Sequence, residues 1–134
     1  MDRASTEQLI RNIFDARKAG EVDDVMRYLT PDVSLRFPGS PASETLARES
    51  SSRDSVRAHL VDLVREWRWT GYEIVSTLID GDSVAVHIRQ SVVHTPTGKA
   101  NTVEVVDLIE LRDGKVCAFV EFVDTALVAS LAQR

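Results

Sequence analysis

The sequence has little of what stabilises small secreted or metal-bound domains. It contains one cysteine, Cys117, so no internal disulfide can form, and no spacing of Cys and His is typical of a zinc site. No apolar run approaches the ~20 residues that span a bilayer. The first seven residues carry Asp2, Arg3 and Glu7 and do not resemble a signal peptide. We therefore expect a soluble, cytoplasmic protein with no membrane partner, no metal and no other cofactor.

Basic charge is also scarce. Sixteen Lys and Arg stand against twenty-one Asp and Glu, which gives a net charge of −5. Binding to phosphates needs a basic face, so nucleic acid is not expected as a partner. With 134 residues, 43% of them hydrophobic, the chain suits a single domain over residues 1–134. The composition excludes the disordered, collagenous and membrane-spanning classes.

The first half of the chain predicts three helices and one short strand. Apolar residues recur on one helical face within 9–14, and Gly20 is typical of a helix end. A second, short helix that includes Leu29 ends at Thr30-Pro31, and 33–37 alternates like a strand. A third helix begins near Asp54. Its predicted buried face consists of Val56, Leu60, Leu63, Val64 and Trp67.

Residues 38–52 interrupt this pattern. They contain two Pro, one Gly and five Ser and show no apolar period. We expect a loop, and a loop of this length is commonly a lid or a binding loop. The alternative is a mobile insertion without a role.

The second half predicts an antiparallel meander of four strands at 72–79, 83–95, 99–111 and 115–124. Each connector carries a Gly where a tight hairpin needs a positive φ. The two middle strands span about 13 residues, or roughly 40 Å, and strands of that length twist and bend strongly. We expect an α+β fold in which three helices from the first half pack on the concave face of a curved antiparallel sheet and enclose a conical cavity.

Three motifs carry a family resemblance: Ala-Gly-Glu-Val-Asp at 19–23, Phe-Pro-Gly at 37–39, and the C-terminal hairpin of 106–116 and 121–124. Together with the order of elements they resemble the nuclear transport factor two-like superfamily, and within it the SnoaL-like (polyketide cyclase / ketosteroid isomerase-like) branch. The resemblance implies a cone-shaped, cystatin-like α+β barrel. Members include isomerases, cyclases, epoxide hydrolases, dehydratases and proteins with no known activity, so the fold alone does not fix a reaction.

Asp107 is the first candidate catalytic residue. It interrupts an apolar run in a central predicted strand, where desolvation would raise the pKa of its carboxyl group. It resembles the protonated oxyanion-hole aspartate of ketosteroid isomerases, a known case of a carboxylic acid kept neutral. The alternative is a carboxylate that caps, pairs structurally or lies at the solvated edge of the strand.

Glu121 is the second candidate, and it resembles in position a catalytic carboxylate of the epoxide hydrolases. A three-residue loop, 112–114, would pair Asp107 with Phe119 and Val105 with Glu121, which places both acids on one face. A two-residue loop would place them on opposite faces. We expect the three-residue loop and an acid pair suited to general acid/base work. The alternative for Glu121 is a salt bridge at a dimer or sheet edge.

The resemblance to known reactions is incomplete. Phe37 occupies the position of the proton-shuttling aspartate of the ketosteroid isomerases. Ile13 or Phe14 occupies the position of their oxyanion-hole tyrosine. Ile88 and Gln90 occupy the Arg-x-Asp positions of the epoxide hydrolases. Neither of these two reactions is supported as it stands.

Aromatic residues are few, eight in all, and most fall where a cavity needs walls. The predicted ligand-binding residues are Phe14, Tyr28, Phe37, Trp67, Ile88, Gln90, Val105 and Phe119. Of the histidines, His87 is expected to point outward, His94 to lie near the cavity mouth, and His59 to lie at the edge of the core. Arg17 is interpreted as a solvated helix residue, with contact to a ligand anion as the alternative.

Apolar residues also alternate on the opposite face of the predicted sheet, among them Val106, Leu108 and Phe122. Because the helices cover the concave face, we expect a homodimer through this outer face. The leading hypothesis is a protein that holds a small apolar carbonyl or polyketide-like molecule, with isomerase, cyclase or dehydratase chemistry at Asp107 and Glu121. The alternatives are a non-catalytic ligand-binding module and a dimeric interaction module whose cavity is filled.

Overall fold

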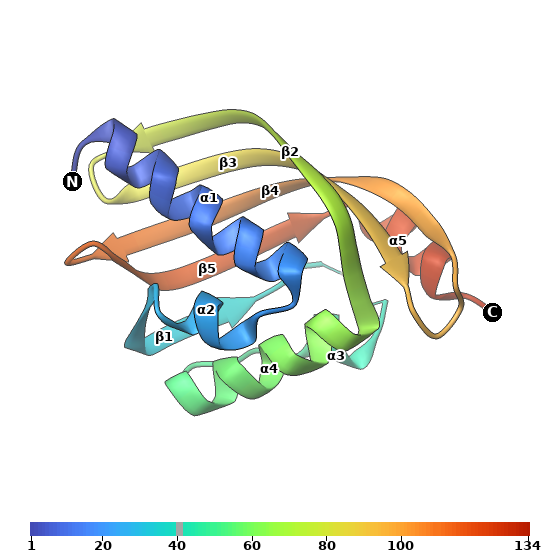
Figure 1. The fold of residues 1–134 in the computed structure, drawn as a ribbon. Helices are drawn as coiled ribbons and strands as arrows, with labels where there is room; N and C mark the ends of the chain where they lie inside the picture. The colour runs from blue at the N-terminus through green and yellow to red at the C-terminus, as the bar shows by residue number, and fades with distance from the viewer. Residues whose placement is uncertain (40–41) are drawn as a thin grey trace.

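A strongly curved five-stranded sheet forms the body of the molecule in the computed structural model, which describes residues 1–39 and 42–134 (Figure 1). The strand order is β1-β5-β4-β3-β2. The strands are β1 (Leu29–Arg36), β2 (Trp67–Asp80), β3 (Ser83–His94), β4 (Ala100–Arg112) and β5 (Lys115–Val123). The four strands β2 to β5 form the predicted antiparallel meander, and β1 adds to β5 in parallel. The α+β prediction is confirmed, with a sheet that is mixed rather than wholly antiparallel.

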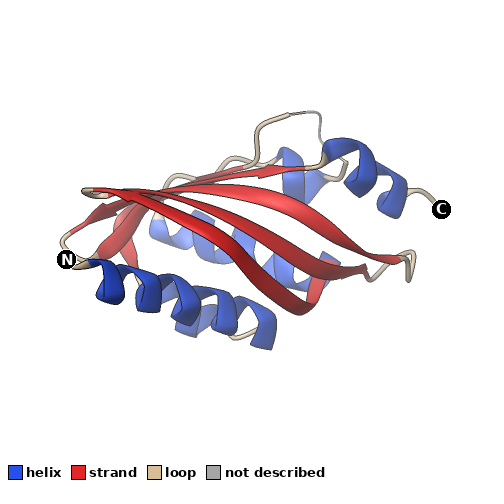
Figure 2. Ribbon diagram, turned by 90° about the horizontal axis from the view of Figure 1, so that it is seen from above, coloured by secondary structure: helices blue, strands red, loops and turns tan. Residues whose placement is uncertain are grey.

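Helices cover the concave face of this sheet. The helices are α1 (Arg3–Ala19), α2 (Val22–Met26), α3 (Glu44–Ala47), α4 (Arg53–Glu66) and α5 (Thr125–Ala132). Figure 2 shows the long α1 and the helices behind it on the same side of the sheet. Helix α5 lies apart from them, beside the C-terminus. The core lies between the concave face and α1, α2 and α4. Phe14, Val86, Ile88 and Ile109 are among its most buried side chains.

Local sequence explains where the two long helices begin and end. Asp2 caps α1 by accepting a hydrogen bond from the Ser5 amide, at 2.7 Å, and Gly20 ends the helix with φ 75°. Ser52 caps α4 through a reciprocal capping box with Ser55. These signals lie in the sequence itself, and the predicted positions of both helices are confirmed.

Three boundaries differ from the prediction. Strand β1 begins at Leu29 rather than at residue 33 and contains Pro31, which an edge strand tolerates because one row of its amides has no sheet partner. Trp67 opens β2 instead of closing a helix. Helix α5 was not predicted, although Asp124 caps it through a 3.1 Å hydrogen bond from the Leu127 amide.

Within the predicted loop, residues 42–52 contain regular structure. They include the short helix α3, and Ser50 forms an isolated antiparallel bridge with Leu35. The prediction of a loop is therefore wrong for 44–47. Residues 40 and 41 of the predicted loop lie outside the described residues.

The turn between β4 and β5 also differs from the prediction. Arg112 pairs with Lys115 around a two-residue turn, Asp113-Gly114, in which both residues have positive φ (53° and 75°). An irregularity beside Cys117 then shifts the register by one residue. The expected three-residue loop is wrong, and so is the pairing of Asp107 with Phe119. The bulge nevertheless keeps Asp107 and Glu121 on one face, directly opposite each other.

Within residues 1–39 and 42–134, none of the helices combines the length and the apolar character needed to cross a membrane.

Candidate functional site

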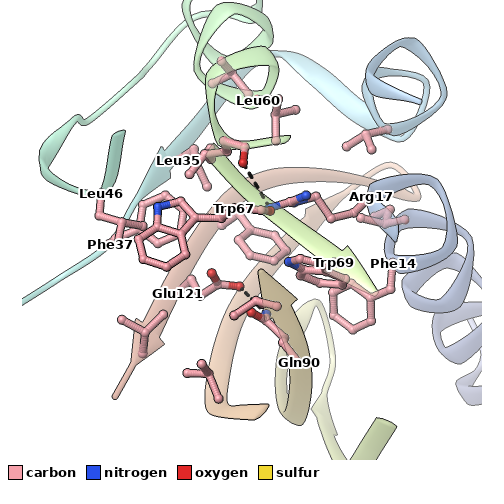
Figure 3. A pocket seen from close by; sticks show the side chains of 18 of the residues that line it. Phe14, Arg17, Leu35, Phe37, Leu46, Leu60, Trp67, Trp69, Gln90 and Glu121 are labelled. Carbon is pink, nitrogen blue, oxygen red and sulfur yellow. Dashed lines mark hydrogen bonds between the residues drawn. The ribbon is translucent and has the colours of Figure 1, made fainter. Parts of the chain in front are cut away.

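A cavity lies between the concave face of the sheet and helices α1, α2 and α4 (Figure 3). About 920 Å³ between its lining atoms is free of protein, including the part that opens to solvent. Its walls are almost wholly aliphatic and aromatic. The charged and amide side chains among the lining residues are Arg17, Gln90 and Glu121. Such a cavity, apolar with a few polar groups, is the usual form of a small-molecule site.

The structure brings six of the ten predicted site residues to this cavity. The lining includes Phe14, Phe37, Trp67, Gln90, Phe119 and Glu121. The other four do not line it, and their predicted positions are corrected. Ile88 and Val105 face the concave side but are 0% and 2% exposed, because the core covers them. Tyr28 lies between α2 and β1 and packs against the outside of that core. Asp107 is also covered, beneath the cavity surface.

Asp107 and Glu121 face each other across the central strands. They are direct partners in the β4–β5 register, and Glu121 reaches the cavity while Asp107 is 0% exposed. Burial raises the pKa of Asp107 well above its usual range, and the nearby Glu121 raises that pKa further by charge and by hydrogen bonding. Burial and this neighbour both favour the neutral carboxylic acid over the carboxylate.

The hydrogen bonding of Asp107 agrees with this protonation state. Among the described residues, neither of its carboxyl oxygens accepts a hydrogen bond. An ionised carboxylate in that position would lack every partner it needs. A protonated Asp107 can instead donate its O–H to Glu121. The two acids thus lie directly opposite each other, with Glu121 at the cavity wall and Asp107 beneath it.

Gln90 positions the exposed member of this pair. Its Nε2 donates a 3.1 Å hydrogen bond to Glu121 Oε1, and its side chain is 4% exposed. Because both residues line the cavity, this bond holds the Glu121 carboxyl group against the wall formed by β3 and β5 (Figure 3). The sequence comparison with epoxide hydrolases placed Gln90 at a polar site position but gave no indication of this partner.

Arg17 is a cavity residue, which the sequence interpretation gave only as the alternative to a solvated helix residue. It projects from α1 into the cavity and lies over the Trp69 ring, 4.9 Å from the ring centroid. Its Nη2 donates to the carbonyl oxygen of Trp67 at 2.6 Å. Burial lowers the pKa of Arg17 to about 10, although Glu121 acts in the opposite direction. It therefore remains a cation at neutral pH, half-buried at the wall of an apolar cavity.

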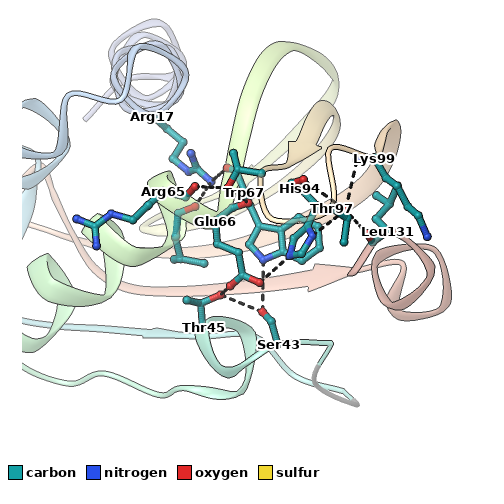
Figure 4. A network of polar contacts seen from close by, with 12 residues as sticks. Arg17, Ser43, Thr45, Arg65, Glu66, Trp67, His94, Thr97, Lys99 and Leu131 are labelled. Atoms are coloured by element: carbon teal, nitrogen blue, oxygen red, sulfur yellow. Dashed lines mark hydrogen bonds and ion pairs between the residues drawn. The ribbon is translucent and has the colours of Figure 1, made fainter. Parts of the chain in front are cut away.

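A second polar cluster lies at the end of the sheet beside α5 (Figure 4). We define this end network as Ser43, Thr45, Glu66, His94 and Thr97. His94 Nε2 lies 2.8 Å from one Glu66 oxygen, and the Thr45 hydroxyl donates to the other at 2.6 Å. His94 Nδ1 lies 3.0 Å from the Thr97 hydroxyl, which donates to the Leu131 carbonyl oxygen. The network thus ties α3 to the end of α4, to β3 and to α5.

The other two histidines divide between core and surface. His87 points outward and forms an exposed ion-pair contact with Glu104, as predicted. His59 is 0% exposed, so its predicted position at the edge of the core is wrong. It bridges Ser50 and the carbonyl oxygen of Thr45, because α4 packs closely against this segment. Within the part of the chain that is described, no group of three His, Cys, Asp or Glu side chains is placed to hold a metal ion.

The outer face of the sheet carries an apolar patch, which we define as Leu78, Ala85, Val106, Leu108, Val120 and Phe122. Leu78, Ala85, Leu108 and Val120 form one row across four strands. Leu78 is 70% exposed, and Val106, Leu108 and Phe122 are each 40–44% exposed. The described part of the chain leaves this patch uncovered.

Comparison with known proteins agrees with this architecture. Residues 10–119 match the SnoaL-like domain. The chain belongs to the SnoaL-like domain family. It therefore lies within the nuclear transport factor two-like superfamily, as the motifs at 19–23 and 37–39 predicted. No protein of curated function matches this SnoaL-like domain in sequence at a significant level.

Solved structures share the fold at low sequence identity. A nuclear transport factor two-like protein from Burkholderia pseudomallei is 20% identical over all of both chains, with a TM-score of 0.84. TerC, co-crystallised with polyporic acid, is 17% identical over 97% of this chain and 99% of its own, with a TM-score of 0.80. A Catenulispora acidiphila protein with a ketosteroid isomerase-like fold, in complex with trimethylamine, is 9% identical over 92% and 91%, with a TM-score of 0.77. At these identities the likeness establishes the fold.

Proposed function

We propose that this SnoaL-like domain binds a small, largely apolar carbonyl or polyketide-like molecule and acts on it by carboxylate acid/base chemistry. The reaction class is isomerisation, cyclisation or dehydration. The observation that carries the proposal is the direct pairing of Asp107 with Glu121 at the floor of an apolar cavity. Two carboxyl groups that share one proton can take up and return a proton without any further reactant.

The two acids have different roles in this proposal. Glu121 reaches the cavity, so it is the catalytic residue that removes a proton from the carbon next to a carbonyl group. It returns that proton at another position of the resulting enolate. Asp107 is buried and is a positioning residue that holds the second proton and stabilises the charge on Glu121. Phe37 lines the cavity and cannot act as a base, so the base comes from β5 rather than from β1.

Two relatives support a small organic ligand. TerC was co-crystallised with polyporic acid, and the Catenulispora protein was solved with trimethylamine. Their identities with this chain are too low to carry over either compound. They support only the class of ligand, a small organic molecule. The structure of that ligand has to be inferred from the side chains of this cavity.

The test is proton exchange at a model ketone. 2-Tetralone, a two-ring ketone with acidic α-protons, is incubated in D₂O with the protein, and loss of its α-proton signal is followed by NMR. We expect the wild type to exchange at least about tenfold faster than Glu121→Gln, since a positioned general base contributes 10²–10⁴-fold. The matched control Glu110→Gln changes a carboxylate on the exposed face of β4 and keeps the wild-type rate. Equal rates in wild type and Glu121→Gln contradict the catalytic proposal.

Ligand binding without turnover is the second candidate function. It is favoured by one observation: Asp107, whose pKa is raised by burial, does not line the cavity. The same experiment separates the two functions. If 2-tetralone binds to the wild type, as measured by calorimetry, but exchanges no faster than in Glu121→Gln, the domain is a binding module.

We propose that the segment 38–52 covers one side of the bound ligand. Leu46, from α3, contributes to the lining, and Thr45 is anchored to Glu66 in the end network. The segment reaches the ligand through α3 and is tethered at Thr45 by Glu66 and His59, and after α3 by the contact of Ser50 with His59.

We also propose that the outer apolar patch binds a second copy of the chain in the cytoplasm. Its centre lacks charge, and its rim carries both signs, in the exposed pairs of Arg89 with Glu73 and Glu104. A two-fold contact would place the patch of one copy against the same patch of the second copy. It would also bring each acidic rim residue near a basic one. Sedimentation should show a wild-type dimer and a monomeric Leu108→Asp variant with unchanged 2-tetralone binding. A monomeric wild type contradicts this proposal.

A further inference from the structure

The guanidinium group of Arg17 lies in the cavity with part of its hydrogen-bonding capacity unused. Arg17 follows Phe14 on the buried side of α1, and its planar group lies over Trp69 (Figure 3). This contact fixes the plane of the guanidinium group. The orientation of the unused donors is therefore determined by the protein before any ligand arrives.

One edge of the guanidinium group is occupied by the end of α4. Nη2 donates to the carbonyl oxygens of Trp67, at 2.6 Å, and Leu63, at 3.4 Å. These carbonyls lie at the C-terminus of α4, where the helix dipole favours a cation. This interaction explains why α1 places an arginine at this position and keeps its side chain half-buried.

The other edge is free. Nη1 is buried and has no hydrogen-bond partner among residues 1–39 and 42–134. Within the same residues no carboxylate lies within ion-pair distance of Arg17, and Glu121 instead accepts from Gln90. A buried charged donor without an acceptor is unfavourable unless something else supplies one. An arginine cannot escape this by losing its proton.

We propose that Nη1 of Arg17 binds an anionic oxygen of the ligand. The substrate class is then an aromatic or otherwise apolar compound that carries a carboxylate or an enolic oxyanion. This inference rests on the proposed function, because it assigns the ligand of the same cavity. The ligand spans the cavity with its anionic oxygen at α1 and its reacting carbon at Glu121 on β5.

The geometry favours an anion over a neutral carbonyl for two reasons. Carbonyl oxygens accept from the guanidinium group, and Glu121 acts on it by charge from beyond ion-pair distance, so an anionic oxygen bonded to Nη1 completes the pairing. The walls around it are apolar, which weakens competition from water and strengthens the charge interaction. A neutral ligand would leave the cation without a negative charge bonded directly to Nη1.

The test uses two probes of the same shape. 2-Naphthoate and 2-acetylnaphthalene differ in a carboxylate oxygen that is replaced by a methyl group. We expect calorimetry to show that the wild type binds 2-naphthoate at least about tenfold more tightly than the ketone, the usual scale for a charge-assisted hydrogen bond. Arg17→Met should lose this preference and retain binding of the ketone. Arg17→Lys should keep part of this preference, because lysine retains the positive charge but lacks the planar guanidinium group.

Controls separate this inference from the proposed function. Arg11→Met removes an exposed arginine of the same helix and should bind both probes as the wild type does. If the wild type binds the ketone as tightly as naphthoate, or if Arg17→Met keeps the preference, the role of Arg17 is refuted while the cavity stands. If neither probe binds to the wild type, the proposed function fails and this inference fails with it. The wild-type preference alone decides the question should Arg17→Met not fold.

Discussion

The two buried polar clusters of this domain are built in opposite ways. In the end network, both oxygens of Glu66 and both ring nitrogens of His94 have partners at 2.6–3.0 Å. In the cavity, Nη1 of Arg17 and both oxygens of Asp107 have none. These three atoms are the only buried side-chain nitrogen or oxygen atoms without a partner in the described part of the chain.

This difference separates structural polar groups from functional ones. Buried polar groups are nearly always paired, so an unpaired one needs a reason. The end network is complete because its role is to hold α3, α4 and α5 together. Under the proposed function, the cavity residues are incomplete because the missing partners are a proton, shared between two acids, and a ligand. The same sheet supports both clusters.

The largest expected effect is the loss of a partner from the end network. His94→Leu leaves a Glu66 oxygen without its donor in a site where the histidine side chain is only 5% exposed. We expect the free energy of unfolding to fall by about 2–3 kcal/mol, as measured by urea denaturation.

His87→Leu is the matched control for that change. His87 also contacts a glutamate at 2.9 Å, but the pair is 36% and 57% exposed. Exposed pairs contribute little, so the expected loss is below about 1 kcal/mol. If both variants lose the same stability, the end network is not the structural cluster that we describe.

Asp107→Asn should change how stability depends on pH. Because the pKa of Asp107 is raised in the folded protein, the unfolded chain releases its proton first as the pH rises. The folded state then binds more protons than the unfolded state, so this group makes stability fall with pH from about pH 4 upward. The slope is up to about 1.4 kcal/mol per pH unit. Asp107→Asn removes this pH dependence. The free energy of unfolding of the variant, relative to that of the wild type, should therefore increase as the pH rises.

The measurement is urea denaturation of both proteins at a series of pH values. Asp113→Asn serves as control, because Asp113 lies exposed in the β4–β5 turn. A stability difference between wild type and Asp107→Asn that does not change with pH would mean that Asp107 titrates normally.

The smallest expected effect concerns His59. Its pKa is lowered by burial, so it is neutral, and its Nε2 donates to the Thr45 carbonyl at 2.6 Å. Nδ1 therefore accepts from the Ser50 hydroxyl, at 2.7 Å. Ser50→Ala should cost about 1 kcal/mol of stability. The exposed Ser51→Ala should cost nothing measurable, and an equal loss in both would show that the buried hydrogen bond contributes nothing.

The sequence predicted the elements better than it predicted the contacts between them. The glycines at 81, 98 and 114 mark three hairpins, and apolar periodicity marks α1 and α4. Helix α5 was missed, although Asp124 at its cap is a readable signal. The bulge beside Cys117 was not predictable, because it reflects how β5 fits both of its neighbours rather than any local residue preference.

In the candidate site, too, the residues were easier to predict than the contacts between them. Asp107 and Glu121 were found because a charge in an apolar run is visible in the sequence. For Arg17, the interpretation as a solvated residue was preferred over ligand contact, because its position depends on where the C-terminal carbonyls of α4 lie, 46–50 residues further along the chain. His59 was misplaced for the same reason. Distant backbone partners decide whether a polar helix residue is solvated or functional.

The most direct test of the account is the protonation state of Asp107. Carbon-13 NMR of protein labelled at aspartate carboxyl groups, assigned with Asp107→Asn, reports whether this carboxyl carries a proton. We predict the chemical shift of a neutral carboxylic acid at neutral pH, and a perturbation of that signal when Glu121 is changed to Gln. A carboxyl signal that is fully ionised at neutral pH and indifferent to Glu121 would contradict the shared-proton pair on which the proposed function rests.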